Sequence, residues 1–279
     1  MKQLPTLRET VEKHGLLAKK SLGQNFLLDM NITDKIIRES LALQKLENFS
    51  RSQVFEVGPG PGGLTRAILK AEPEILTVIE MDTRCIEIMN EIRDIVGEQL
   101  QIVEGDALKF DFLRINNNLP KHIISNLPYN ISVPLFIKWL KNMSSFQSLT
   151  LMFQKEVAER IMASTGNKSY GRISVLAQLT CKIDKLFDLN PNCFVPAPKI
   201  WSSVLLFRPN SNIIPSEILQ KVEKITELAF GQRRKMIRQS LKTLPNLENI
   251  CSDLGIETTL RAEDITPEQY LSLAQKLTV

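Results

Sequence analysis

Short runs of apolar residues recur along the first part of the chain, and helix-compatible stretches lie between most of them. The helix-compatible stretches are Leu64–Lys70, Cys85–Ile95 and Pro134–Lys141, and the runs typical of buried strands are Gln53–Val57, Leu76–Ile79, Leu100–Val103, His122–Ser125 and Leu149–Phe153. This alternation predicts an α/β domain with a doubly wound parallel sheet and helices on both faces. Ligands of such sheets bind outside the carboxyl ends of the strands, so residues that directly follow the strands are the functional candidates.

The pattern changes near residue 209. A strand-like Ser203–Phe207 gives way to turn formers, and beyond them apolar residues recur at near-helical spacing, at Ile218, Val222, Ile225 and Ala229. Thr266-Pro267-Glu268-Gln269 has the form of a capping box with proline at the first helical position. We therefore expect a larger domain over residues 1–208 and a small helical domain over residues 209–279.

A glycine-rich loop follows the first predicted strand and opens a helix. It fits the G-x-G-x-x-G pattern through Gly58, Gly60 and Gly63, a pattern shared by dinucleotide-binding and methyltransferase folds. Pro59 and Pro61 lack the N–H groups that a pyrophosphate-binding loop uses. A ligand without phosphates, such as S-adenosylmethionine (SAM), therefore fits this loop better than NAD does.

Acidic residues follow the next two predicted strands. Glu80 is placed to accept hydrogen bonds from both hydroxyls of a ribose, which NAD and SAM share, so it does not separate the two ligands. Asp106, in Gly105-Asp106-Ala107, could accept a hydrogen bond from the amine of a bound adenine. It could equally be the N-cap of a helix.

The tetrad Asn126-Leu127-Pro128-Tyr129 follows the fourth predicted strand. It suits methylation of a planar amino nitrogen such as N6 of adenine, whose lone pair is delocalised into the ring. The Asn126 side-chain oxygen and the Leu127 carbonyl can accept the N–H hydrogens, while Pro128 fixes the turn and Tyr129 offers a ring for stacking. Such catalysis depends on positioning rather than on a strong base. An ordinary turn is the alternative.

These motifs resemble those of the small-subunit (16S) ribosomal RNA adenine dimethyltransferases of the kasugamycin-sensitivity type, over nearly the whole chain. The matching segments are Ser21–Leu27, Glu56–Gly60, Glu80, Asp106, Asn126–Tyr129, Tyr170–Ser174 and Phe194–Lys199. Two departures stand out. Pro61-Gly62-Gly63 replaces the commoner Leu-Gly-Ala, and Gln239 stands where the family usually has Asn.

The resemblance implies a Rossmann-like class I SAM-dependent methyltransferase domain with a small C-terminal all-helical domain. Asn126, Leu127, Pro128 and Tyr129 would be catalytic, and Phe194 would form the wall of the base slot that faces Tyr129. SAM would be held by Asn25, Leu27, Gly58, Gly60, Glu80, Met81, Asp106, Ala107 and Asn126. The implied reaction dimethylates N6 of two adjacent adenines in the 3′-terminal hairpin loop of 16S rRNA, in a late assembly particle of the small subunit.

Three other functions remain open at this point. A large-subunit (23S) rRNA adenine methyltransferase of the macrolide-resistance type would have the same fold and chemistry, although Leu127 and the segment Leu260–Ile265 favour the small-subunit enzyme. A ribosome-assembly factor without catalysis is the second alternative, and the intact Asn126 argues against it. NAD-dependent redox chemistry is the third, but it leaves the tetrad unexplained.

The charge balance points to RNA only when its distribution is considered. Lysine and arginine exceed aspartate and glutamate by 35 to 31, a mild surplus. The segment 231–242 carries five cations and no acid, namely Arg233, Arg234, Lys235, Arg238 and Lys242. As a helix it would place Arg234, Arg238 and Lys242 on one face, a stripe that suits RNA phosphates. A solvated cationic face without a ligand is the alternative.

Cysteine use and the absence of apolar tracts suggest the compartment. Cys85, Cys181, Cys193 and Cys251 form no C-x-x-C pair, so we expect neither a metal site nor a disulfide framework. No stretch approaches the ~18 apolar residues of a membrane span, and residues 1–20 do not resemble a signal peptide. We expect a cytoplasmic monomer that acts on RNA and not on membranes.

Overall fold

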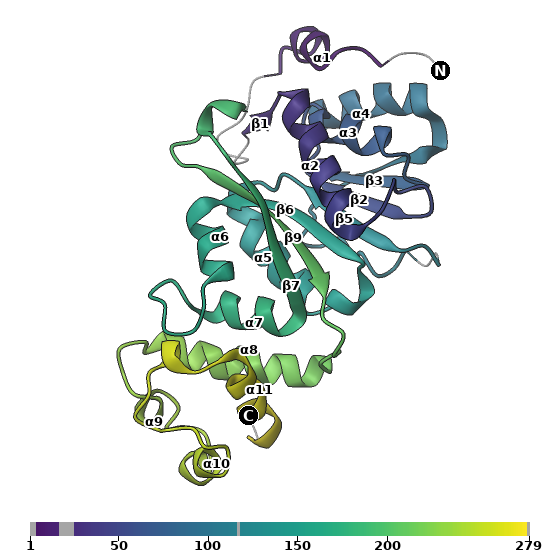
Figure 1. Ribbon diagram of the computed structural model, residues 1–279. Coiled ribbons are helices and arrows are strands. Elements are labelled where there is room, and N and C mark those ends of the chain that lie inside the picture. The colour runs from purple at the N-terminus through teal and green to yellow at the C-terminus, as the bar shows by residue number, and fades with distance from the viewer. Residues whose placement is uncertain (1–3, 17–24, 116–117, 278–279) are drawn as a thin grey trace. The chain divides into compact units, whose positions relative to one another are not determined.

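The computed structural model describes residues 4–16, 25–115 and 118–277 of the chain (Figure 1). The chain packs as two compact units, of which the first comprises Met1–Phe136, Ser145–Lys155 and Asp184–Phe207. The second comprises Ile137–Ser144, Glu156–Ile183 and Arg208–Val279. Residues 209–279 thus all belong to the second unit, which also takes two earlier segments. The division into domains 1–208 and 209–279 stays a prediction.

The first unit is built on a sheet whose strand order is β4-β3-β2-β5-β6-β9-β7. The five strands from β4 to β6 pair in parallel, and β9 runs antiparallel to β6. The strands are β2 (Gln53–Val57), β3 (Ile75–Glu80), β4 (Leu100–Glu104), β5 (Lys121–Ser125), β6 (Ser148–Gln154), β7 (Cys181–Leu189) and β9 (Ser202–Pro209). This confirms the predicted α/β class with a doubly wound sheet. The five predicted parallel strands all form, whereas β7 was missed because its burial pattern is mixed.

Register brings the predicted functional residues to one edge of the sheet. Val57 pairs with Ile79 and Glu80 pairs with Glu104, so the strands β2, β3 and β4 end nearly level. Ser125, the last residue of β5, pairs with Leu151 of β6. The residues that follow these strands therefore emerge together at the carboxyl edge.

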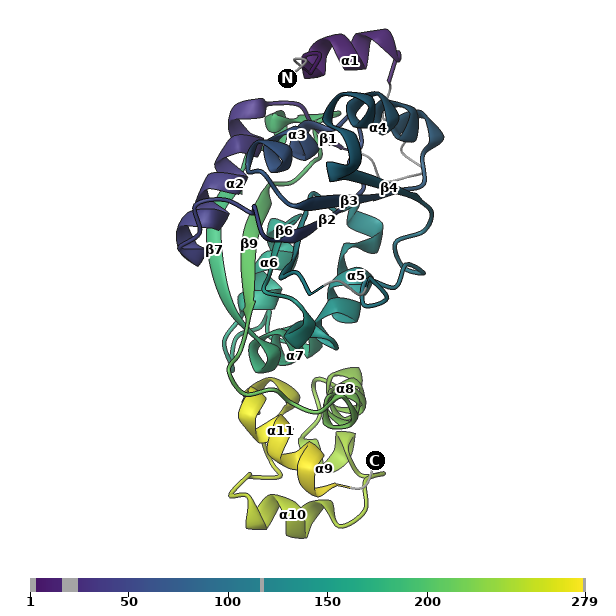
Figure 2. The ribbon, with the colours of Figure 1, turned by 90° about the vertical axis from the view of Figure 1, so that its right-hand side faces the viewer.

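Three helices cover one face of this sheet, as Figures 1 and 2 show. They are α2 (Met30–Gln44), α3 (Gly63–Lys70) and α4 (Thr83–Val96), and they bury Ile36, Ile68 and Ile88 against Val54 and Leu76. Two other short elements of this unit are α1 (Leu7–Lys13) and β1 (Phe26–Leu27), and β1 pairs with β8 (Phe194–Val195) in a separate two-stranded sheet.

On the opposite face, phenylalanine rings fill the core. Phe136 packs against Phe153 and Phe207, with ring centroids 5.4 and 4.5 Å away, and Phe55 packs against Phe112 at 5.5 Å. Phe136 belongs to α5 (Tyr129–Leu140). This helix begins five residues earlier than the Pro134 start expected from sequence, because Pro134 is accommodated inside it. Tyr129 is consequently its first residue.

The second unit is helical, with α6 (Lys155–Met162), α7 (Arg172–Thr180), α8 (Ser216–Gly231), α9 (Ile237–Ser240), α10 (Leu247–Asp253) and α11 (Pro267–Lys276). Tyr170 and Tyr270 lie at its centre on either side of Phe230, and both phenol groups donate to backbone carbonyls. The predicted capping box at Thr266 is confirmed, with its hydroxyl accepting from the Gln269 N–H. Among the residues described, no helix is long and apolar enough to span a bilayer.

The prediction of one continuous basic helix over residues 231–242 is wrong. Helix α8 ends at Gly231, a turn follows, and Met236 pairs with Arg261 in an isolated bridge before the short α9 begins. The Ile237 N–H donates to the Leu260 carbonyl at 2.7 Å, and the Ile237 side chain is fully buried. Burial of this apolar residue and its backbone pairing outweigh local helix propensity, so Arg234, Arg238 and Lys242 do not form a helical stripe.

Candidate functional site

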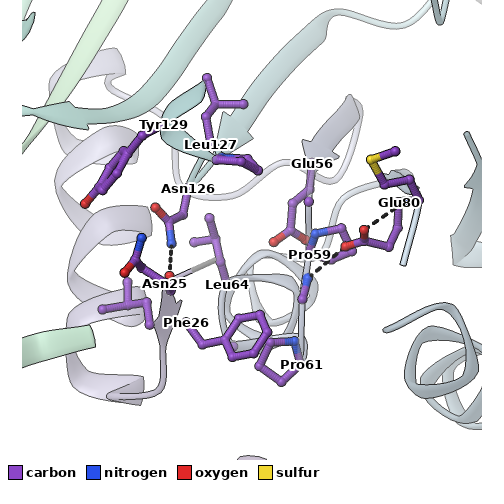
Figure 3. A pocket seen from close by; sticks show the side chains of 16 residues that line it. Asn25, Phe26, Glu56, Pro59, Pro61, Leu64, Glu80, Asn126, Leu127 and Tyr129 are labelled. Carbon is purple, nitrogen blue, oxygen red and sulfur yellow. Dashed lines mark hydrogen bonds between the residues drawn. The ribbon is translucent and has the colours of Figure 1, made fainter. Parts of the chain in front are cut away.

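A cleft opens at the carboxyl edge of the sheet in the first unit (Figure 3). Its walls come from the ends of β2, β3 and β5 and from β1. The lining residues are Asn25, Phe26, Leu27, Glu56, Gly58, Pro59, Gly60, Pro61, Gly63, Leu64, Glu80, Met81, Asn126, Leu127, Pro128 and Tyr129.

The glycine loop needs glycine at position 63 because other backbone lies against it, and at position 60 because of a positive φ. A Cβ on Gly63 would stand 2.6 Å from the Leu27 carbonyl oxygen, closer than any side chain tolerates. Gly60 has a φ of +55°, and a Cβ there would lie 3.0 Å from the Phe26 ring. At position 63 this chain has glycine where the family commonly has alanine, and the missing Cβ lets β1 approach the start of α3.

The buried cation Arg66 holds the same loop from below. Its Nη1 donates to the carbonyls of Pro61 and Gly62 at 2.9 and 3.0 Å, and its Nη2 donates to the Thr10 hydroxyl at 2.9 Å. Burial lowers the pKa of Arg66, and the nearby Glu56 opposes that shift. Arg66 therefore ties the glycine loop to helix α1, a role that the sequence did not reveal.

Glu80 is preorganised by backbone donors at the end of β3. Its Oε1 accepts from the N–H groups of Met81 and Asp82 at 2.8 and 2.9 Å, and its Oε2 accepts from Gly60 at 3.3 Å (Figure 3). Burial raises the pKa of Glu80, and these three hydrogen bonds counteract part of that rise. Fixed from two sides, the carboxylate lies in the cleft where the sequence predicted the acid.

Glu56 is a second acid in the cleft, and it was not among the predicted site residues. It is 1% exposed, and its Oε2 accepts from the Thr65 hydroxyl at 2.7 Å. Burial raises its pKa to about 8, with Glu80 adding to the rise and Arg66 opposing it. Glu56 could have been found from sequence, because a carboxylate between Phe55 and Val57 in a strand predicted to be buried needs a partner or a ligand.

The tetrad forms the wall opposite these acids. The Ser125 hydroxyl donates to the Val57 carbonyl at 2.6 Å and so ties the end of β5 to the end of β2. The Asn126 Nδ2 donates to the Asn25 carbonyl at 3.4 Å, which orients the amide in the cleft (Figure 3). The Tyr129 hydroxyl and the Ser202 hydroxyl are hydrogen-bonded at 2.9 Å, and this contact fixes the phenol ring.

The structure does not bring every predicted site residue to the cleft. Asp106 lies beyond β4, where its Oδ1 accepts from the Leu108 N–H at 2.9 Å in a local turn, and Ala107 is buried beside it. Phe194 is 2% exposed and belongs to the hydrophobic core, with Leu27 as its strand partner. None of the three lines the cleft, so their roles stay predictions. The family-like residues Ser21–Gln24 lie outside the described residues.

The predicted RNA-contacting cations divide into three groups in the second unit. Arg238 and Lys242 line one open hollow, which also contains the acid Glu248. Arg233 forms an ion pair with Glu263. Arg234 and Lys235 are exposed in the turn after α8.

Comparison with known proteins decides the family. The ribosomal RNA adenine dimethylase family matches residues 15–278. The chain belongs to this family. A ribosomal RNA small subunit methyltransferase A of Rhizobium johnstonii is 47% identical over 277 residues, and the alignment covers 98% of this chain and 98% of that protein. The protein of the same name from Rhodospirillum rubrum is 44% identical over 98% of this chain and 92% of its own.

Solved structures agree with this family. A dimethyladenosine transferase from Plasmodium falciparum has a TM-score of 0.71 at 26% identity, covering 88% of this chain and 94% of its own. The 23S rRNA methyltransferase ErmE has a TM-score of 0.65 at 23% identity, covering 91% of this chain and 99% of its own, and shows the shared fold. The expectation of a class I methyltransferase fold and of a methyl-transferring enzyme that acts on rRNA is confirmed.

Proposed function

We propose that this enzyme transfers methyl groups from SAM to N6 of two adjacent adenines in the 3′-terminal hairpin loop of 16S rRNA, giving N6,N6-dimethyladenines during small-subunit assembly. The observation that carries the proposal is the Asn126 tetrad, which forms one wall of a cleft whose other wall holds two buried acids. The names of the relatives, ribosomal RNA small subunit methyltransferase A, support the choice of the small subunit.

The charge of the cleft fits SAM. Glu56 and Glu80 both line it, so in their ionised forms they favour a cationic ligand and disfavour a diphosphate such as NAD. SAM carries an ammonium and a sulfonium, and when bound it supplies an electrophilic methyl group. Glu80 would accept from the ribose hydroxyls, while Asn25, Leu27, Gly58, Gly60, Met81 and Asn126 would form the walls, with Asp106 and Ala107 toward the adenine.

The tetrad then orients the target amine. With Nδ2 held by the Asn25 carbonyl, the Asn126 side-chain oxygen is free to accept one amine hydrogen, and the Leu127 carbonyl can accept the other. Localising the nitrogen lone pair in this way directs it at the methyl group without a strong base. Pro128 fixes the turn, and Tyr129, held by Ser202, offers its ring to the base. Phe194 would supply the second ring.

The basic residues of the second unit extend the proposal to the substrate particle. Arg233, Arg234, Lys235, Arg238 and Lys242 would contact rRNA phosphates, with Arg238 and Lys242 acting together in their hollow. We place the enzyme in the cytoplasm as a monomer, and sedimentation of the purified protein would test the monomeric state.

The deciding experiment compares Asn126→Ala with Asn130→Ala on small-subunit particles and SAM. Asn130 is exposed on the first turn of α5, so it is a matched control for loss of an amide. We expect kcat to fall by about 10²–10³ for Asn126→Ala, the cost of removing one preorganised hydrogen-bonding group, and to stay unchanged for Asn130→Ala. An Asn126→Ala protein with nearly full activity would contradict the assignment.

The same reaction products identify the substrate. Primer extension and mass spectrometry on both ribosomal RNAs should locate dimethyladenine in the 3′-terminal hairpin of 16S rRNA. Methylation of 23S rRNA alone would overturn the choice of substrate while leaving the chemistry in place. Binding of NAD without binding of SAM would overturn the cofactor.

A further inference from the structure

The segment of residues 195–201, here called the rim segment, joins two walls of the cleft. At its start, Val195 pairs with Phe26 of β1, a residue that lines the cleft. Directly after its end, Ser202 holds the Tyr129 hydroxyl at 2.9 Å. Ser202 begins β9 and pairs with Gln154, the last residue of β6, so the rim segment lies at the carboxyl edge of the sheet.

The rim segment exposes apolar side chains that a folded domain usually covers. Val195 is 55% exposed, Ile200 39% and Trp201 46%, although the neighbouring strand β9 is almost entirely buried. An exposed tryptophan beside a binding site is typical of a surface that contacts a ligand.

The charge of this part of the chain favours a nucleic acid. Lys199 is exposed within the rim segment, and the sequence contains no acidic residue from position 189 to position 216. An aromatic ring beside a cation, in a segment that itself contains no acid, is the arrangement by which proteins hold single-stranded RNA.

We propose that Trp201 is a stacking platform for a nucleobase adjacent to the target adenine. The proposal rests on the proposed function, since it takes the base at Tyr129 to be an adenine of single-stranded rRNA. The short connection from Trp201 through Ser202 to Tyr129 keeps the two rings on the same edge of the first unit. Trp201 would thereby position the strand and strengthen RNA binding without touching the reacting atoms.

Steady-state kinetics with small-subunit particles and SAM, together with binding of short single-stranded RNAs that contain two adjacent adenines, test the proposal. We expect Trp201→Ala to raise the RNA KM by roughly 5- to 150-fold, the loss of one stacked base, with kcat and the SAM affinity unchanged. Trp201→Phe should restore most of the affinity. Leu46→Ala is the control, because Leu46 is a comparably exposed apolar residue that precedes the amino end of β2, at the opposite edge of the sheet.

The RNA itself provides a second control. Two oligonucleotides carry an abasic site, one on each side of the adenine pair. The one that lacks the stacked base should bind the wild type and Trp201→Ala equally, whereas the other should still bind the wild type more tightly. An unchanged RNA KM for Trp201→Ala would overturn the proposal. So would a loss of affinity that is the same for the intact and both abasic oligonucleotides, because that result indicates general damage.

Fluorescence provides a readout that is independent of methyl transfer. The chain has two tryptophans, and Trp139 is only 1% exposed, so quenching on addition of RNA reports on Trp201. Quenching that disappears in Trp201→Phe supports the platform even if the RNA is not methylated. Absence of quenching in a wild type that methylates the RNA overturns the platform and leaves the proposed function standing.

Discussion

The cleft of the first unit and the basic segment of the second present their charges in opposite ways. In the cleft, Glu56 and Glu80 are buried, and each is fixed by hydrogen bonds to neighbouring groups. In the basic segment, Arg234, Arg238 and Lys242 are exposed and spread over a turn, a short helix and the residues after it. Buried charges act strongly over short distances, whereas exposed charges act weakly, add up and are screened by salt.

This contrast explains what each region can do. A buried, fixed pair of acids can select a small cationic ligand and hold it in one orientation. An exposed group of cations can attract a large phosphate-rich particle without fixing its orientation. The cleft therefore has to position the target base. Substitutions in the cleft should therefore have large and specific effects, and substitutions in the basic segment should have small and additive ones.

The largest effect should come from Gly63→Ala. The added Cβ would meet the Leu27 carbonyl oxygen at 2.6 Å, and because this is a backbone atom the clash can be relieved only by moving β1 or the glycine loop. We expect a loss of about 1–3 kcal/mol in unfolding free energy, measured by denaturant titration, and weaker SAM binding measured by calorimetry.

Gly231→Ala is the matched control for that substitution. Gly231 ends α8, and a Cβ there meets nothing within 4 Å. Its stability and SAM affinity should equal those of the wild type. If Gly63→Ala were equally harmless, the close packing of β1 on the glycine loop would not matter for the cleft.

The next effect concerns pH and Glu56. Since the pKa of this carboxyl is raised to about 8 by burial, it is mostly protonated at pH 6 and must ionise to pair with a cationic ligand. We expect the ratio of the SAM affinities of wild type and Glu56→Gln to rise with pH up to about 8, by at most about tenfold per pH unit, and then to level off. Titration of the ligand's own amine affects both proteins and cancels in the ratio.

The free protein should show the opposite trend in stability. A carboxyl whose pKa is higher in the folded state than in the unfolded state binds more protons when folded, so its contribution to stability is present at low pH. That contribution is lost as pH rises from about 4.5 through about 8. Denaturant titrations should show the wild type losing stability relative to Glu56→Gln over this range. Parallel curves would show that Glu56 does not titrate there.

The smallest effect should come from Arg238→Gln combined with Lys242→Gln. If each residue contacts one phosphate, the double variant should bind small-subunit particles a few-fold more weakly at moderate salt. The slope of log affinity against log salt should flatten by about 0.7–0.9 per lost contact. A filter-binding series over several salt concentrations measures both quantities.

Arg234→Gln combined with Lys235→Gln removes the same charge from the neighbouring turn. Because the two pairs belong to different local structures, we expect their effects on binding to add. Strong coupling between the pairs would favour a single contact surface, as the predicted helical stripe required. An unchanged salt slope in both double variants would argue that these cations are only solvated.

Local patterns predicted much of the cleft. The strand-loop-helix order around Gly58, the acid at Glu80 and the tetrad at Asn126 lie within a few residues of strand ends. Strand ends meet at one edge in any doubly wound sheet, so sequence position was enough to bring these groups together. Asp106 also follows a strand end, but it does not line the cleft and its Oδ1 accepts a hydrogen bond in a local turn, so its contact with a ligand stays a prediction.

The sequence by itself therefore determined the fold class and placed Glu80 and Asn126 at the carboxyl edge of the sheet, where they line the cleft. The tertiary structure decided the rest. It set the burial that raises the pKa of Glu56, the approach of β1 that requires Gly63, and the bond from Ser202 that fixes Tyr129. It also replaced the basic helix with a turn and a bridge. Each of these depends on residues far apart in the chain, whose contacts form only when the whole unit packs and which no local pattern encodes.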